Sequence, residues 1–304
     1  MPLLKVFILA IVQGLAELLP VSSSAHVVVA EKLLHLDPSS PEMTLLLVML
    51  HTGTMFAVIV YFWKQWGRSY FATADAFKRF AIRAIAATAL TGIIGYPLQK
   101  IIAKLAFPNA PKAQIEDLFG RLDLVAYALF AVGLLILWAG LKERNAAKSE
   151  AAADYARSVT RSGDNVTFPQ SLWMGAIQGL SLPFRGFSRS GSTISGGLLA
   201  GATRERAERF SFALAVILTP AVVGREALRL LHASKEAAAA GTPIDLHGSI
   251  VGALLGMVFA FFAGLAGLRW LSSWLESGKW YLFGIYCLVA SAFVAFLHFG
   301  PRHL

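Results

Sequence analysis

The stretch 1-MPLLKVFILAIVQGLAELLPVSSSAHVVVAEKLLHL-36 contains two apolar arms around a centre rich in proline and serine. A second stretch, 169-PQSLWMGAIQGLSLPFRGFSRSGSTISGGLLAG-201, is built in the same way around glycine, serine and arginine. No arm reaches the roughly 20 apolar residues that a helix needs to cross about 30 Å of hydrocarbon. We therefore predict two re-entrant helical hairpins, whose irregular centres lie at membrane depth against protein or a water-filled cavity.

The composition of the 304-residue chain indicates an all-α polytopic membrane protein rather than a soluble one. Apolar residues make up 56% and charged residues 15%, whereas soluble domains have roughly 45–50% and 25%. We read the apolar N-terminus as mature structure, because Gln13 and Glu17 interrupt it and no small-residue cleavage pattern follows. The single cysteine, Cys287, excludes a disulfide framework and a cysteine metal cluster.

Basic residues predict the topology. Lys and Arg gather in residues 64–83 and 142–168, so we expect both segments to be cytoplasmic. The net charge of +9 thus comes from basic residues that flank the membrane spans, and we expect no nucleic-acid partner. Six apolar segments are predicted to cross the membrane: 43–63, 84–100, 122–141, 210–231, 249–271 and 280–299.

The two broken stretches resemble each other. Both 12-VQGLAELLPVSSS-24 and 177-IQGLSLPFRGFSRSGS-192 have a Gln-Gly-Leu step followed by proline and serines. We predict a first repeat, 1–141, a polar linker, 142–168, and a second repeat, 169–304, with hairpins 1–36 and 169–201 each followed by three spans. The odd number of crossings would invert the second repeat. The alternative is that such Gly/Ser-rich breaks recur by chance.

Glu17 is the only carboxylate in residues 1–30, and it shares a helix face with Gln13, four residues earlier. A charge at mid-membrane costs at least about 2.5–3.5 kcal/mol for Asp, Lys or Arg on insertion scales. Such a group normally faces a cavity and marks function. The alternative is a carboxylate at the membrane interface that reaches the lipid headgroups.

After Pro20, the chain carries three consecutive serines, Ser22, Ser23 and Ser24, and then His26. Serines at a helix start satisfy backbone amides as caps, but a helix N-terminus also binds anions, and a hydroxyl there could attack a bound phosphate. His26 can exchange protons near neutral pH, or it can simply bond a neighbouring carbonyl.

The second hairpin supplies a cation, Arg189, between Ser188 and Ser190 and shortly before Thr193. A planar guanidinium on a glycine-flanked turn at membrane depth suits a phosphate. Arg185 either helps Arg189 to bind the phosphate or faces the lipid headgroups. His51, which lies with Thr52 and Thr54 in the predicted span 43–63, either lines the cavity or lies at the interface.

The motifs 13-QGLAELLPVSSSAH-26 and 186-GFSRSGSTISGG-197 resemble those of the bacterial undecaprenyl-diphosphate phosphatases, also called bacitracin resistance proteins. That family pairs a (Glu/Gln)-xxx-Glu motif, a Leu-Pro-Val-Ser-Ser stretch and a histidine with a later Pro-Gly-x-Ser-Arg-Ser-x-x-Thr motif. Length and hydrophobic layout agree along nearly the whole chain. There are two departures: Gln13 removes one carboxylate, and Arg185 stands where the proline is expected, with Pro183 two residues upstream.

The resemblance implies an enzyme of the bacterial inner membrane that hydrolyses undecaprenyl diphosphate to undecaprenyl phosphate and orthophosphate at the periplasmic face. This reaction would recycle the lipid carrier for cell-wall synthesis and confer bacitracin resistance. We expect Ser23 to be the nucleophile, unless water attacks directly, and Glu17 and His26 to move protons. Arg189 and the polar turns would hold the diphosphate, with this binding set: Gln13, Ser22, Ser24, Ser188, Ser190, Thr193 and Arg185.

Other partners and activities are possible. Mg²⁺ or Ca²⁺ could accompany the diphosphate, but the sequence shows no dedicated ligand cluster, so we expect no structural metal site. A carrier built from inverted repeats with broken helices could flip the lipid phosphate across the membrane instead of cleaving it. An inert scaffold is disfavoured because burying Glu17 and Arg189 is costly. The chain could also form a homo-oligomer.

Overall fold

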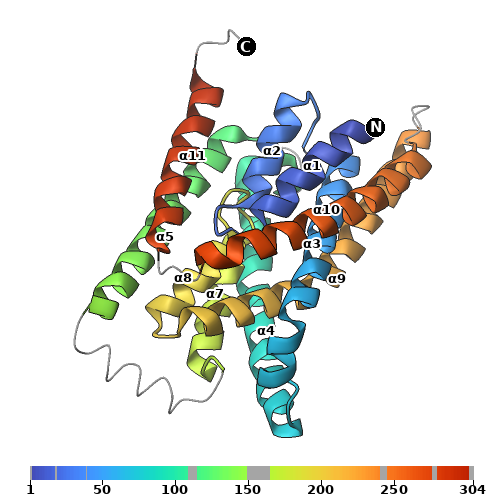
Figure 1. Cartoon of the computed structure of the whole chain (residues 1–304). Helices are drawn as coiled ribbons and strands as arrows, with labels where there is room; N and C mark the ends of the chain where they lie inside the picture. Colours follow the sequence, from blue (N-terminus) through green and yellow to red (C-terminus); the bar gives the residue numbers. More distant parts are fainter. Residues whose placement is uncertain are drawn as a thin grey trace.

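A computed structural model describes residues 2–17, 19–38, 40–108, 115–148, 165–239, 245–275 and 279–300. These residues form ten α-helices and one short 3-10 helix, and they contain no strand (Figure 1). The helices are α1 Leu3–Ala16, α2 Ser23–Leu33, α3 Pro41–Ser69, α4 Ala74–Ala106, η1 Ile115–Leu118, α5 Leu122–Lys148, α7 Phe168–Ser181, α8 Arg189–Leu199, α9 Arg204–Ala239, α10 Leu246–Leu275 and α11 Tyr281–Phe299.

Six of these helices are long and apolar enough to cross a membrane: α3, α4, α5, α9, α10 and α11. The predicted six-span membrane protein is therefore confirmed. Most of the helices continue beyond the apolar runs that predicted them, and α4 covers Ala74–Ala106 where the sequence predicted 84–100. A helix can continue in this way because terminal Lys and Arg side chains reach the polar interface while their backbone stays hydrogen-bonded.

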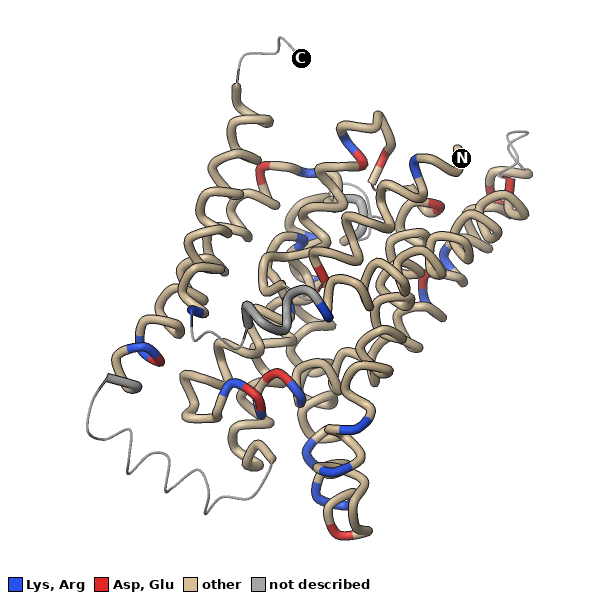
Figure 2. Tube along the Cα trace, viewed as in Figure 1, with Lys and Arg blue, Asp and Glu red and all other residues tan. Residues whose placement is uncertain are grey.

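Basic residues gather at one end of the molecule, where α3 passes into α4 (Figure 2). This segment contains most of the cluster that predicted a cytoplasmic loop at 64–83. The first part of the predicted linker 142–168 is helical, since α5 ends at Lys148. Residues 149–164 of that linker lie outside the described residues.

The two predicted hairpins are pairs of short helices with matching lengths. Helices α1 and α7 each have 14 residues, and α2 and α8 each have 11. At about 1.5 Å per residue, 14 residues extend only about 21 Å, less than the hydrocarbon thickness. This length fits hairpins that enter the membrane and return to the same side. The re-entry of the hairpins and the inversion of the second repeat stay predictions.

The packing of the two hairpins is reciprocal. Helix α1 packs against α10 of the second half, and α7 packs against α4 of the first half. Equivalent glycines allow both contacts: a Cβ on Gly14 would lie 2.8 Å from the Gly264 backbone nitrogen, and one on Gly179 would lie 2.9 Å from the Thr91 carbonyl. Each glycine follows a fully buried glutamine, Gln13 or Gln178. The first helix of each half thus packs against a long helix of the other half, as expected for two intertwined repeats.

Candidate active site

The turns of the two hairpins meet inside the helix bundle. A Cβ placed on Gly191, in the first turn of α8, would lie 2.8 Å from the Pro20 carbonyl oxygen in the α1–α2 turn. The buried Cys287 thiol of α11 donates to the same carbonyl at 3.7 Å. Because Gly191 has no side chain, the start of α8 can lie directly against the turn that carries Glu17 and the serines.

Glu17, which directly follows α1, is the centre of a buried polar cluster and is only 4% exposed. Its Oε2 accepts hydrogen bonds from Gln13 Nε2 at 2.7 Å and from Ser23 Oγ at 2.5 Å. Its Oε1 accepts from Arg189 Nη2 at 3.2 Å. Three donors, one of them a guanidinium, compensate for the removal of this carboxylate from water.

Arg189 is the first residue of α8, and its side chain is 21% exposed, so part of it stays accessible. Its second terminal nitrogen, Nη1, donates to the Ser211 carbonyl of α9 at 3.4 Å. Thr193 fixes this arrangement, because its hydroxyl bonds the Arg189 carbonyl at 2.8 Å and the Ser211 hydroxyl at 2.5 Å. The guanidinium is thus held from α9 while it faces Glu17.

The serines divide into caps and one hydroxyl that bonds the carboxylate. Ser22 caps α2 by accepting from the Ala25 amide at 3.4 Å, and Ser188 caps α8 by accepting from the Gly191 amide at 3.0 Å. Two further serine hydroxyls lie near these caps, namely Ser24 at 3.3 Å from Ser22 Oγ and Ser190 at 3.5 Å from Ser188 Oγ. Both α2 and α8 therefore begin at the cluster, where their first amides and helix dipoles favour an anion.

His51 of α3 belongs to the same cluster, which the sequence motifs did not predict. Its Nε2 lies 3.2 Å from Glu17 Oε2 and 3.5 Å from Ser23 Oγ. Its Nδ1 lies 2.9 Å from the Leu47 carbonyl oxygen, which can only accept, so Nδ1 carries a hydrogen. The available signal was a histidine followed by Thr52 and Thr54 in an otherwise apolar run. Of the two alternatives that the sequence left open for His51, the contact with Glu17 favours the one in which it lines the site.

Two other predicted site residues make different contacts. His26 donates from Nδ1 to the Ser22 carbonyl at 2.8 Å, and its Nε2 lies 2.7 Å from the Tyr286 hydroxyl of α11. Arg185 stacks over the Phe119 ring at 3.9 Å from its centroid. Within the described part of the chain, neither side chain hydrogen-bonds to Glu17.

The chemistry of the cluster is therefore that of an anion site next to a hydroxyl and an imidazole. Among the described residues, no group of three or more His, Cys, Asp or Glu side chains could hold a metal ion. A divalent ion that arrives with a diphosphate stays a prediction.

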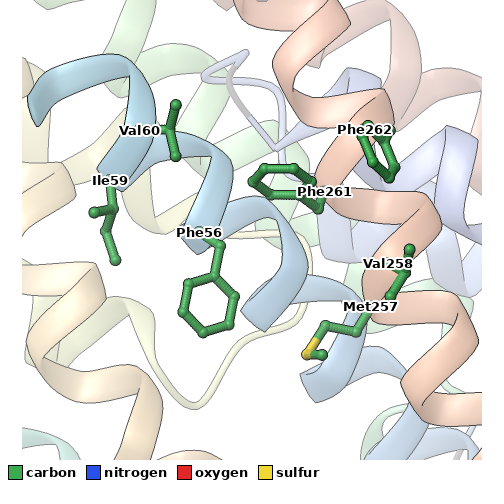
Figure 3. Close-up of a pocket in the computed structure, with 7 residues that line it drawn as sticks. All are labelled: Phe56, Ile59, Val60, Met257, Val258, Phe261 and Phe262. Carbon is green, nitrogen blue, oxygen red and sulfur yellow. The ribbon is translucent and has the colours of Figure 1, made fainter.

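An apolar groove of about 390 Å³ lies between α3 and α10 (Figure 3). It is lined entirely by apolar side chains: Phe56, Ile59, Val60, Met257, Val258, Phe261 and Phe262. His51 precedes Phe56 by five residues on α3, which is about 7.5 Å along the helix axis. The groove thus begins roughly one turn and a half from the polar cluster.

Fold and site together define a class: a multi-pass helical membrane protein with a buried ionic cluster between two short helical hairpins. Residues 6–293 match the family described as bacitracin resistance protein BacA, and the chain belongs to this family, as its motifs predicted. It is 52% identical over 294 residues to Undecaprenyl-diphosphatase 2 of Acinetobacter baylyi, with 97% of each chain covered. It is 33% identical over 315 residues to Undecaprenyl-diphosphatase of Desulfatibacillum aliphaticivorans, covering 97% of this chain and 99% of the relative.

Proposed function

We propose that this protein hydrolyses undecaprenyl diphosphate to undecaprenyl phosphate and orthophosphate, which recycles the lipid carrier for cell-wall synthesis and confers bacitracin resistance. The family and the named relatives support this activity. The observation that carries it in the structure is the cluster of Glu17, Ser23 and Arg189, built from both hairpin turns.

Arg189 binds the diphosphate in this proposal. A guanidinium offers several donors in one plane, which matches the oxygens of a phosphoryl group. The starts of α2 and α8 add backbone amides with partial positive charge. The remaining polar turn residues, Ser22, Ser24, Ser188 and Ser190, surround these helix starts and would orient the phosphates.

Ser23 attacks the terminal phosphorus. Its Oγ forms a bond to phosphorus while the bond from that phosphorus to the bridging oxygen breaks, and undecaprenyl phosphate leaves with the bridging oxygen. Water then hydrolyses the phosphoserine, which releases orthophosphate and restores the hydroxyl. Glu17 holds Ser23 in place at 2.5 Å, and Glu17 and His26 move protons. Direct attack by water on the same phosphorus is the alternative route.

The groove between α3 and α10 holds the part of the polyprenyl tail next to the diphosphate. Its lining is wholly apolar, and Phe56, Val60 and Phe262 are each at least half exposed on the outer surface. A tail in this groove would lie beside the membrane lipids, so the long substrate need not enter the bundle. Only the diphosphate has to reach the buried cluster.

We further propose that the protein lies in the bacterial inner membrane with its site open to the periplasm. The basic segment where α3 passes into α4 supports this orientation, since Lys and Arg favour the cytoplasmic side (Figure 2). Inversion of the two repeats would bring their hairpin turns together from opposite faces near the middle of the membrane.

The deciding experiment measures both cleavage and transport. Purified protein in detergent is given undecaprenyl diphosphate, and inorganic phosphate is measured; the same protein in proteoliposomes is given labelled lipid phosphate, and its crossing is followed. We expect phosphate release by the protein. If phosphate is not released while the labelled lipid still crosses, the protein is a carrier and the hydrolase proposal is wrong.

A further inference from the structure

Gln13 is the amide form of the (Glu/Gln)-xxx-Glu motif, so the cluster has one carboxylate fewer than the form with two glutamates. Its amide nitrogen donates to Glu17 Oε2 at 2.7 Å, so it acts here as a donor. Its own Oε1 is buried and has no hydrogen-bond partner among the described residues. An amide cannot take up a proton at neutral pH, so position 13 does not assist the removal of a proton from Ser23 or from water.

Glu17 is the only carboxylate that contacts Ser23 within the described residues, and its two oxygens already serve other groups. Oε2 accepts from Gln13 and Ser23, and Oε1 accepts from Arg189. These bonds hold the hydroxyl and the guanidinium in position. A second acceptor beside Ser23 would take up the proton of the nucleophile while these bonds stay in place.

The imidazole of His51 has the position for this task. Because Nδ1 donates to the Leu47 carbonyl, the neutral ring presents the lone pair of Nε2 toward Ser23 Oγ, 3.5 Å away. A contact of this length is within the range seen for catalytic pairs before substrate binds. Rotation of the Ser23 hydroxyl about its Cβ–Oγ bond turns its hydrogen from Glu17 to Nε2.

The ring also lies beside a second acceptor. Glu17 Oε2 lies 3.2 Å from Nε2 and would accept a hydrogen bond from the imidazolium. Arg189, on the far oxygen of the same carboxylate, is the nearest cation of the cluster and is already paired. Helix α10 presents Gly264, which has no side chain, to Thr54 of α3.

We propose that His51 is a catalytic base of this enzyme, in place of the carboxylate that Gln13 lacks. The inference rests on the proposed phosphatase function. As Ser23 Oγ bonds to the terminal phosphorus, its proton passes to His51 Nε2 and the bridging oxygen leaves with undecaprenyl phosphate. In the second step, water attacks the phosphoserine, and the imidazolium returns its proton to Ser23 Oγ as orthophosphate departs.

The test compares His51→Gln with a matched control, His232→Gln, on the exposed end of α9. We expect His51→Gln to lower the kcat for phosphate release by about 10²–10⁴-fold with little change in KM, and the control to match the wild type. His51→Asn, a second variant that keeps a polar side chain, should lose as much. Equal size-exclusion profiles in detergent show that each variant is folded.

A second comparison is specific to the proposal. The double variant Gln13→Glu/His51→Gln restores a group that can hold a proton beside Glu17, since two close carboxylates share one. We expect it to regain at least tenfold in kcat over His51→Gln alone. Wild-type rates in both His51 variants, or a double variant as slow as His51→Gln, would overturn the role of His51. An inactive wild type would instead remove the proposed function and this inference with it.

Discussion

Arg189 and Glu17 form an ion pair, Nη2 to Oε1 at 3.2 Å, that joins the first residue of α8 to the end of α1. The two residues are 172 positions apart in the sequence. Removing one partner of a buried pair leaves the other charge uncompensated, at a cost of about 3–5 kcal/mol. The pair therefore fixes the hairpins to each other and keeps a guanidinium where a phosphate can reach it.

The shape of the guanidinium should matter as well as its charge. Arg189→Lys keeps a cation beside Glu17 but loses the planar fork, so we expect kcat/KM to fall about a hundredfold while the protein stays folded. Steady-state phosphate release measures this change, with Arg68→Lys at the exposed end of α3 as the control. Unchanged kcat/KM would mean that Arg189 only balances the charge of Glu17.

Substitution of two neighbouring serines should distinguish a catalytic hydroxyl from a hydroxyl that caps a helix. Ser23→Ala removes the hydroxyl that bonds Glu17, and we expect phosphate release to fall at least about a thousandfold. Ser22→Ala removes the cap of α2, which should lower the free energy of unfolding by about 1 kcal/mol with a much smaller loss of activity. Substantial activity in Ser23→Ala would instead support direct attack by water.

The sequence predicted much of this site, because its hairpin centres are short motifs in which proline, glycine and serine break apolar runs. Their likeness indicated two equivalent hairpins, and the Glu17 to Arg189 contact joins the two centres. His51 could not be assigned in this way. It lies inside an uninterrupted helix, and the face it presents to Glu17 depends on how α3 packs, which the apolar run 43–63 does not specify. The helix ends were also missed, since polar residues extend the helices beyond the apolar spans.

His26 provides a separate test of proton movement. Its ring is fixed by the Ser22 carbonyl and the Tyr286 hydroxyl. We expect His26→Gln to lower kcat at least about tenfold, and Tyr286→Phe, which keeps the stacked ring, to lower it less. The measurement is the rate of phosphate release at saturating substrate. If His26→Gln turns over at the wild-type rate, the histidine serves packing against α11 and takes no part in catalysis.

The groove should distinguish long from short substrates. Val60→Asn places an amide among apolar side chains, and we expect KM for undecaprenyl diphosphate to rise about tenfold, which corresponds to the lower end of the free energy of burying one valine side chain. KM for a short-chain polyprenyl diphosphate should stay unchanged. Val289→Asn, on the exposed surface of α11, is the matched control. Equal effects of Val60→Asn on long and short substrates would place the tail elsewhere.

The central claim is that the carboxylate of Glu17 organises a phosphatase site. The most direct measurement is inorganic phosphate released from undecaprenyl diphosphate by purified wild type, Glu17→Gln, and Glu236→Gln at the exposed end of α9. Glutamine keeps the shape of the side chain but loses the charge that holds Ser23, His51 and Arg189. We predict that wild type and Glu236→Gln release phosphate equally while Glu17→Gln loses at least about a hundredfold in rate. Phosphate release by Glu17→Gln at the wild-type rate would contradict the account.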